Sequence, residues 1–431
     1  MGDLYERDLR ALATVQRLRF FPLAAVGGQG SWLFAEDGRR LLDLSASWGS
    51  ASLGYGHPAV TAAITTASAS PAGSTGLSVA NQHAVEFAEQ LLDTLPEPLS
   101  SASSVYLGHA GSDANSAVIR AARLASGRRL VVSFGGSYHG GLGEAYDVSG
   151  LQAERVGGVA AHGGSVLLPY PVTAEQRDQV LGRMDAALAS RDVAVVLVEP
   201  LLSDGGVYAP ASGFLAGLGR LCEATGTLLA VDEVKVGIGR TGSLHAFSFE
   251  GVVPDAVVFG KGIGGCLPLS AAVAPRAIFD AAPAALLLTT AGNPICAAAG
   301  SAVLRTVIAE QLPEHAKLVG QRIRDGLAAL VAEQPVLREV RGRGLSLGLE
   351  IDDAEAPGGA AAFTAMLVYR CWELGAVMYP VGPTSSVVEL TPPLVLTVNE
   401  ADLAVERISQ AVADVLAGRV RTDAVARYQG W

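Results

Sequence analysis

Lysine is nearly absent from this chain of 431 residues. Only Lys235, Lys261 and Lys317 occur, so nearly all of the 31 basic residues are arginines. Charged residues make up 17% of the sequence and the formal net charge is −11, which argues against a basic face for nucleic acid or an anionic membrane. No apolar run reaches the ~18 residues that a membrane-spanning helix needs. The sequence therefore predicts a soluble protein without a nucleic-acid or membrane partner.

Cysteine and histidine are also scarce. The seven histidines are scattered, and the four cysteines (Cys222, Cys266, Cys296 and Cys371) lie far apart. This spacing fits neither a zinc site nor a disulfide framework, so no metal is expected and a reducing cytoplasm is the expected location. The first twelve residues are charged and helix-like rather than typical of a signal peptide.

Three short runs rich in Val and Leu recur in the middle of the chain, and a polar residue ends each. These are 193–198 before Glu199, 227–231 with Asp232, and 255–259 before Lys261. Such runs are typical of strands buried on both faces, and their separation of about 30 residues is that of a βαβ unit. We therefore predict a parallel α/β sheet whose carboxyl ends gather functional groups.

The length of the chain favours more than one domain. We predict a large α/β domain at 56–305 with a mostly parallel central sheet. A smaller α+β domain is expected from 1–55 together with 306–431, because 33–45 reads as a hairpin with Asp37-Gly38 at its turn and the C-terminal part alternates helical and strand-like segments.

A segment at 108–125, GHAGSDANSAVIRAARLA, follows a predicted strand and opens a helix. Gly111, Ser112 and Asp113 therefore sit at a helix N-terminus, where free N–H groups and the helix dipole favour a phosphate. An ordinary N-cap is the alternative. The segment is not a P-loop, and the glycines of GKGIGG (260–265) lack the spacing of a dinucleotide-binding loop.

Two strand ends carry groups that need an explanation. Asp232 requires a cationic or hydrogen-bonding partner, which could be a pyridinium nitrogen or, alternatively, Lys235 or Arg240. Desolvation of Lys261 at the end of an apolar strand favours a neutral, nucleophilic amine that can form a Schiff base, although the amine could instead reach solvent. With the phosphate-ready helix, these residues meet the three demands of pyridoxal 5′-phosphate (PLP).

An aromatic pair, Tyr138 and His139, stands in SYHGG at 137–141. Both rings could stack on a planar cofactor, and ordinary loop packing is the alternative.

The motifs GSDAN, SYHGG, VDEVKVGIGRTG, FGKGIGG, TTAGNP and TPPL follow one another along the chain. In this order they resemble the class III, fold type I family of PLP-dependent aminotransferases over nearly the whole chain. The resemblance implies the following roles: Lys261 for the Schiff base, Asp232 on the pyridine nitrogen, Gly111, Ser112 and Asp113 at the phosphate, and Tyr138 stacked on the ring. It also implies that Thr289 reaches the phosphate of a neighbouring subunit, so a homodimer or larger homo-oligomer is expected.

Three positions depart from a typical transaminase. Lys235 replaces the glutamine of the family's DEVQ motif near the ring hydroxyl, where it could donate to the phenolic oxygen. Asp204 lies in EPLLSDGG, where its carboxylate could exchange the α-proton. Glu389 stands near the position of an arginine that holds the substrate carboxylate. A carboxylate beside Glu389 would be repelled, so a neutral amide, a lactam or an amine is expected there, unless Glu389 pairs with a local arginine.

These departures, with Trp48 and the terminal Gly-Trp pair, resemble the α-amino-ε-caprolactam racemases and amino-amide racemases. That resemblance implies that Trp48, Tyr138, Asp204 and Glu389 contact the substrate. Ala291 departs from it, because a histidine is implied at that position of TTAGNP.

The predicted activity is a PLP-dependent racemase or epimerase acting on an α-amino lactam, an α-amino acid amide or a related amino acid. The implied route runs through an external aldimine and a carbanion, with Lys261 and Asp204 as acid and base, since inversion needs two proton-transfer groups at one carbon. The alternatives are a class III aminotransferase acting on an amine or amino acid and a 2-oxo acid, and a regulatory scaffold without cofactor.

Overall fold

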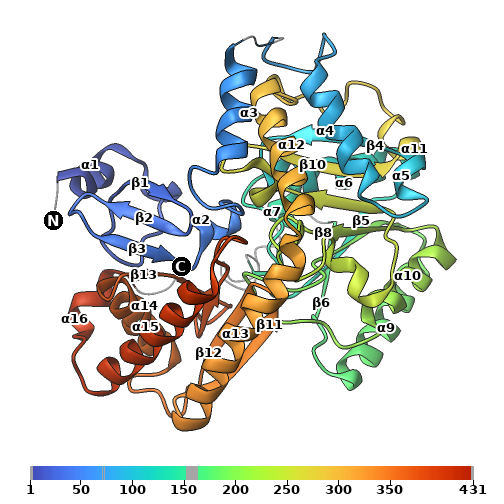
Figure 1. The fold of residues 1–431 in the computed structure, drawn as a ribbon. Helices are drawn as coiled ribbons and strands as arrows, with labels where there is room; N and C mark the ends of the chain where they lie inside the picture. Colours follow the sequence, from blue (N-terminus) through green and yellow to red (C-terminus); the bar gives the residue numbers. More distant parts are fainter. Residues whose placement is uncertain (1–2, 70, 72, 152–163, 429–431) are drawn as a thin grey trace. The chain divides into compact units, whose positions relative to one another are not determined.

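Two compact units make up the chain in the computed structural model, which describes residues 3–69, 71, 73–151 and 164–428 (Figure 1). The large unit is Pro58–Glu314, and the small unit combines Met1–His57 with His315–Trp431. The large unit starts and ends slightly later than the domain expected at 56–305, partly because helix α12 (Pro294–Ala309) runs past residue 305. The terminal Gly430-Trp431 pair lies outside the described residues.

A seven-stranded sheet forms the centre of the large unit, in the order β4-β10-β9-β8-β7-β5-β6. The strands are β4 (Ser103–Gly108), β5 (Leu130–Phe134), β6 (Ser165–Leu168), β7 (Val193–Val198), β8 (Leu228–Asp232), β9 (Ala256–Phe259) and β10 (Ser270–Pro275). Neighbouring strands from β9 to β6 pair in parallel, whereas β10 is antiparallel to both β4 and β9. The sheet is therefore mixed but mostly parallel, as predicted.

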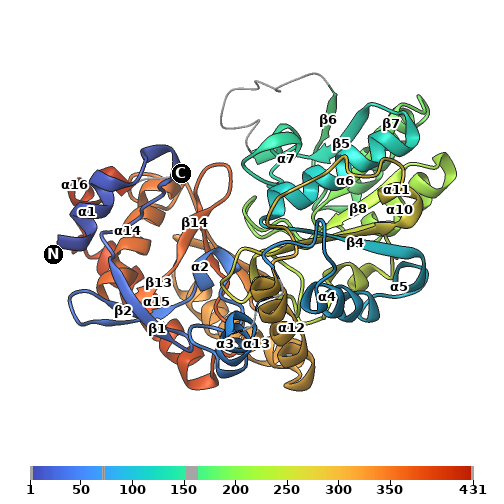
Figure 2. The same ribbon diagram turned by 90° about the horizontal axis from the view of Figure 1, so that it is seen from above.

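Helices cover this sheet. They are α3 (Pro58–Ala69), α4 (Gln82–Asp93), α5 (Leu99–Ala102), α6 (Gly111–Ser126), α7 (Gly143–Asp147), α9 (Ala174–Leu188), α10 (Phe214–Thr225), α11 (Arg276–Phe279) and α12. Both views show α3 beside α12 (Figures 1 and 2). Helix α6 ends at Gly127, whose φ of 69° gives the left-handed cap that glycine adopts without a steric cost.

The core of the large unit lies between α6 and the sheet. Val118 and Ile119 of α6 are fully buried in one apolar cluster with Val195 of β7 and Val258 of β9. Each such side chain contributes about 1.5–3 kcal/mol through burial. This packing fixes the start of α6 next to the carboxyl edge of the sheet.

The small unit holds two four-stranded sheets. One has the order β1-β2-β3-β13, from β1 (Ala25–Gln29), β2 (Trp32–Ala35), β3 (Arg40–Asp43) and β13 (Ala376–Val377). The other has the order β11-β12-β15-β14, from β11 (Leu337–Arg343), β12 (Ser346–Ile351), β15 (Val387–Leu390) and β14 (Tyr379–Val381). The β2–β3 pair is the hairpin expected at 33–45.

Helices of the small unit are α1 (Asp3–Ala11), α2 (Ala46–Gly49), most of α13 (Leu312–Glu333), α14 (Ala360–Glu373), α15 (Val398–Leu416) and α16 (Thr422–Val425). Strand β15 of the C-terminal part ends at Leu390. Pro392 and Pro393 follow closely, and proline cannot donate to a sheet ladder.

The described residues show neither a single membrane-spanning helix nor a metal site. No single helix there is long and apolar enough to cross a bilayer, although α12 and α13, bent by 68°, pass as a pair on length and composition alone. The same residues contain no group of three His, Cys, Asp or Glu side chains arranged to hold a metal ion.

Candidate active site

Polar and aromatic residues, several of them predicted site residues, lie together at the carboxyl edge of the large sheet. Glu199 follows β7, Asp232 ends β8 and Lys261 comes just after β9, so three neighbouring parallel strands deliver them to the same edge. The segment after β5 adds Tyr138 and His139. Ligands bind at this edge of open α/β sheets because the loops there converge.

Asp232 is held by three donors. Asn115 Nδ2 donates to Asp232 Oδ2 at 2.8 Å, His139 Nδ1 lies 2.8 Å from the same oxygen, and the Val234 N–H donates to Oδ1 at 2.9 Å. Asp232 is 3% exposed, so these contacts stabilise its charge and fix its direction. A carboxylate has about four acceptor positions, which leaves one for a further donor.

His139 does not have the predicted role. Its side chain is fully buried, and the imidazole Nδ1 is hydrogen-bonded to Asp232. The imidazole is therefore packed against Asp232, which corresponds to the packing alternative and not to stacking on a cofactor ring. Asn115 was missing from the predicted site, and it also donates to the His139 carbonyl at 2.8 Å. Its place in GSDAN, three residues after Ser112 on α6, is the signal that could have identified it.

The predicted phosphate site is the start of α6. The first-turn N–H groups of a helix have no partner within the helix, and they favour an anion. Ser112 Oγ accepts from the Gly141 N–H at 3.2 Å. Gly140 has a φ of 147°, and a Cβ on it would overlap Ser112 Oγ. Gly140 therefore lets the loop backbone pack directly against Ser112 at the start of α6.

Asp113 differs from Gly111 and Ser112 in its contacts. Its carboxylate accepts from the His109 N–H at 2.9 Å, the Ala110 N–H at 3.0 Å and the Ser270 hydroxyl at 2.9 Å. These contacts turn the carboxylate towards its own loop and β10. Asp113 thus shapes the phosphate loop, and the prediction that it contacts the phosphate finds no support in this side-chain direction.

Asp204 lies between two lysines. Lys235 Nζ is 2.5 Å from Asp204 Oδ1, and Lys261 Nζ is 3.9 Å from Asp204 Oδ2. The Lys235 and Asp204 side chains are only 4% and 5% exposed, whereas Lys261 is 23% exposed. The salt bridge considered from the sequence joined Lys235 to Asp232, and the structure instead places Lys235 against Asp204.

The backbone at Lys261 is unusual. It opens a short 3-10 helix, η3 (Lys261–Gly264), with a φ of 45°. Left-handed backbone is uncommon for a residue other than glycine and is concentrated at functional sites.

Glu199 was also missing from the predicted site, although it follows β7 much as Lys261 follows β9. Its carboxylate accepts from the Tyr138 N–H at 2.8 Å and from the Ser203 N–H at 3.2 Å. Burial raises the pKa of Glu199 to about 8, with further repulsion from Asp232 and then Asp204. The site therefore contains three carboxyl groups, and burial favours the protonated form of Glu199.

Three predicted residues lie in other settings. Trp48 belongs to the small unit, where its ring stacks on Tyr379 with 4.6 Å between centroids. Glu389, also in the small unit, is buried on β15 opposite Gly348 and Tyr379. Thr289 is an exposed turn residue of the large unit.

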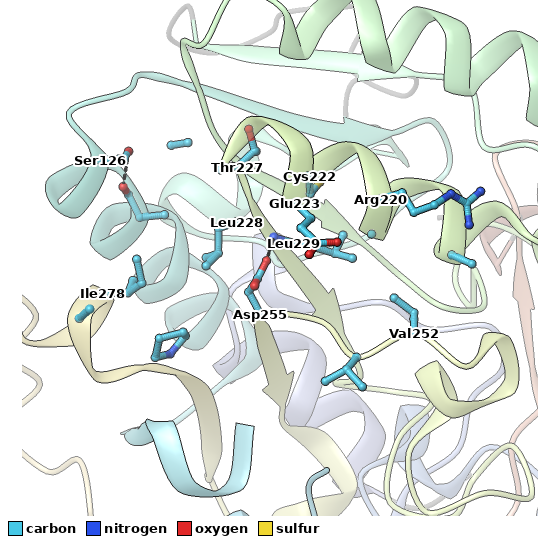
Figure 3. A pocket seen from close by; sticks show the side chains of 18 of the residues that line it. Ser126, Arg220, Cys222, Glu223, Thr227, Leu228, Leu229, Val252, Asp255 and Ile278 are labelled. Carbon is cyan, nitrogen blue, oxygen red and sulfur yellow. Dashed lines mark hydrogen bonds between the residues drawn. The ribbon is translucent and has the colours of Figure 1, made fainter. Parts of the chain in front are cut away.

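A separate cavity of about 790 Å³ lies at the other end of β8 (Figure 3). Leu228, Leu229, Cys222 and Asp255 line it, and Asp255 Oδ2 accepts from the Leu229 N–H at 2.8 Å. Since its lining contains none of the predicted site residues, its volume does not identify the active site.

The geometry at the carboxyl edge fits PLP. The N–H groups at the start of α6 suit the phosphate; Asp232 offers a buried acceptor for a protonated ring nitrogen; and Lys261 supplies the amine. Asn115 and His139 orient the Asp232 carboxylate, which this fit requires.

Comparisons with known proteins agree with this fit. A family model for class-III aminotransferases matches residues 14–412. An alanine/serine racemase from Pyrococcus horikoshii is 31% identical, over 98% of this chain and 92% of that protein. An acetylornithine aminotransferase from Agrobacterium fabrum is 34% identical, over 93% of this chain and 96% of that protein.

A solved structure extends the similarity to the fold. A phospholyase from Arthrobacter, in complex with phosphoethanolamine, is 30% identical with a TM-score of 0.84, covering 95% of this chain and 99% of that one. The two units, the mostly parallel sheet and these whole-length matches show that this chain belongs to the class-III aminotransferase family, with the fold of type I and pyridoxal 5′-phosphate as its cofactor.

Proposed function

We propose that this PLP enzyme is a racemase or epimerase that inverts the α-carbon of an α-amino lactam, an α-amino acid amide or a related amino acid. The observation that carries the proposal is the position of the Asp204 carboxylate, 3.9 Å from the Lys261 amine and held by Lys235. The racemase among the similar proteins supports the same reaction type.

Inversion needs two groups that can each hold the α-proton. Bound PLP withdraws electrons from the α-carbon of a substrate amine joined to it, which makes the α-proton removable. In this proposal the Lys261 amine and the Asp204 carboxylate are the two groups that take or return this proton. Lys235 keeps Asp204 ionised and oriented, because a buried carboxylate without a cation would be costly.

Other residues hold the cofactor in this proposal. Asp232 keeps the ring nitrogen protonated, Gly111 and Ser112 bind the phosphate, and Tyr138 stacks on the ring. Lys235 also donates to the phenolic oxygen. The Asn115 and His139 contacts support the first of these roles, since they leave Asp232 with a fixed direction and a free acceptor position.

The substrate class follows from Glu389 and Trp48. Both are assigned to the substrate site, where Glu389 disfavours a free carboxylate and Trp48 packs against an apolar substrate group.

Amino transfer is the second candidate. Most of the similar proteins carry aminotransferase names, and a transaminase needs Lys261 alone to move the proton. In this reaction Asp204 would orient Lys261 or the substrate rather than carry a proton. A scaffold without cofactor is not retained, because the family and the Asp232–Lys261 arrangement agree on PLP.

We also propose a cytoplasmic homodimer or larger homo-oligomer. Thr289 is exposed and Leu287, two residues earlier, is 60% exposed, which suits a segment that contacts a second subunit. Thr289 would then reach the partner's phosphate.

Incubation of a single enantiomer in deuterated water tests the proposal. Racemisation predicts loss of optical activity with deuterium at the α-carbon and no keto product, whereas a stoichiometric keto product would identify a transaminase. Asp204→Asn should keep the visible absorption of bound PLP and lower racemisation by roughly 10²- to 10⁴-fold. Asp255→Asn, at the other end of the sheet, is the matched control. A normal rate in Asp204→Asn would rule out the two-base assignment.

A further inference from the structure

Glu199 joins two loops that carry different parts of the site. Glu199 Oε1 accepts from Tyr138 N in the loop after β5, and Oε2 accepts from Ser203 N, next to Asp204. One carboxylate therefore holds the backbone beside the proposed ring-stacking residue and the backbone beside the proposed acid/base residue.

The same two loops also touch directly. A Cβ on Gly205 would overlap the Gly136 carbonyl oxygen and approach its Cα to 3.2 Å. Gly136 has a φ of 73°, a conformation that glycine adopts readily. No side chain separates the loops here, so a small change in one backbone must displace the other.

Glu199 itself is firmly placed. It follows β7, which pairs with β5 on one side and β8 on the other, and Tyr170 OH donates to the Glu199 carbonyl at 2.9 Å. The residue is 5% exposed. Its carboxylate is thus attached to the end of a central strand and holds two loops that have no regular secondary structure at these contacts.

Only a carboxylate suits both contacts. Two N–H donors need two acceptor oxygens, whereas glutamine offers one oxygen and one donor group. The charge is unfavourable here, because burial and the neighbouring Asp232 and Asp204 all oppose ionisation of Glu199. The two hydrogen bonds that Glu199 accepts, from Tyr138 N and Ser203 N, offset this cost.

We propose that Glu199 is a positioning residue that sets the distance between the Tyr138 loop and the Asp204 loop, and so places the Asp204 carboxylate against Lys235 and Lys261. The inference rests on the roles proposed above for Tyr138 and Asp204. It predicts that the two loops loosen together when Glu199 loses one acceptor.

Amide hydrogen exchange of the apoprotein tests the coupling without any reaction. In Glu199→Gln, peptides covering 135–141 and 200–207 should both exchange about tenfold faster, the effect of losing one hydrogen bond. Asp255→Asn, which alters the carboxylate that accepts from Leu229 N, is the matched control and should leave both peptides protected. Unchanged exchange in either loop of Glu199→Gln overturns the proposal.

A kinetic measurement separates positioning from a general effect on folding. With PLP bound, Glu199→Gln should lower kcat for α-deuterium exchange roughly 10- to 100-fold, the effect of a small misplacement, with KM within about twofold. A 10- to 100-fold rise of KM with an unchanged kcat would contradict the positioning role of Glu199. If Glu199→Gln fails to fold, Gly205→Ala gives the same readouts, because its methyl group pushes the loops apart while Glu199 remains.

The outcomes also distinguish this proposal from the proposed function. Faster exchange in both loops of an enzyme that only transaminates supports the coupling and refutes racemisation. Racemisation by the wild type with a fully active, fully protected Glu199→Gln supports the function and refutes the coupling.

Discussion

Replacing Glu233 with glutamine should stabilise the large unit more as the pH rises. Glu233 is 1% exposed, its Oε1 accepts from the Phe247 N–H at 2.7 Å, and its Oε2 is buried without a hydrogen-bond partner among the described residues. The His245 imidazole lies nearby, with its Nδ1 3.9 Å from Oε2. Burial raises the pKa of Glu233 from the usual 4.5 to about 8.

The pH dependence follows from proton binding. Below pH 4.5, Glu233 is protonated in both the folded and the unfolded protein and does not lower the free energy of unfolding. Between pH 4.5 and about 8, only the folded protein keeps the proton, so the free energy of unfolding falls as the pH rises. At about 1.4 kcal/mol per pH unit, the full loss is about 5 kcal/mol. Glutamine never ionises, and its oxygen can still accept from Phe247.

Thermal unfolding of the apoprotein at a fixed scan rate measures this difference. The midpoint of Glu233→Gln minus that of the wild type should grow by roughly 10 °C from pH 4.5 to 8.5, at about 2 °C per kcal/mol for a unit of this size. Burial lowers the pKa of His245 to about 4, which changes stability in both proteins and so largely cancels. Glu250→Gln, which alters the carboxylate accepting from Gly213 N, controls for the loss of one negative charge. A difference that does not vary with pH would refute the reasoning.

Two further predictions concern the cofactor edge. Lys235→Gln should keep PLP absorption but slow α-deuterium exchange and lower the free energy of unfolding by up to about 3–5 kcal/mol, since it removes the buried ammonium group 2.5 Å from Asp204 Oδ1; unchanged kinetics would remove Lys235 from the mechanism. Gly140→Ala should weaken PLP binding because its Cβ would displace Ser112 at the start of α6, measured as a raised Kd by absorbance titration; an unchanged Kd would show that the contact between Gly140 and Ser112 does not shape the phosphate site.

The strands were predictable because burial leaves a direct record in the sequence. Val193–Val198 is buried at every position, so its continuous apolar run is a reliable signal. Strand β10 was harder to predict, since Ser270–Pro275 is rich in alanine and has only one of the branched residues that mark β7, Val273. The direction of β10, antiparallel to β4 and β9, is set by the connection from β9, and the local sequence pattern does not indicate it.

Side-chain contacts at the site were less predictable than its location. The strand ends identified Asp232 and Lys261, but not that Asn115 and His139 converge on Asp232 from 117 and 93 residues away. Lys235 shows the same limit. Its sequence neighbours are Asp232 and Glu233, yet its acid is Asp204, 31 residues earlier in a loop whose path the sequence does not define.

The scarcity of lysine, combined with its burial, has a practical consequence for amine chemistry. Lys235 is enclosed with its acid, Lys261 is the amine assigned to the cofactor, and Lys317 is the exposed lysine. A reagent that acylates amines should therefore attach to the surface through one lysine side chain besides any free α-amine, while a further adduct reports an unoccupied Lys261. A protein with this distribution can be tethered or labelled at a defined point, and the mass of the labelled chain then counts how many molecules carry a working cofactor.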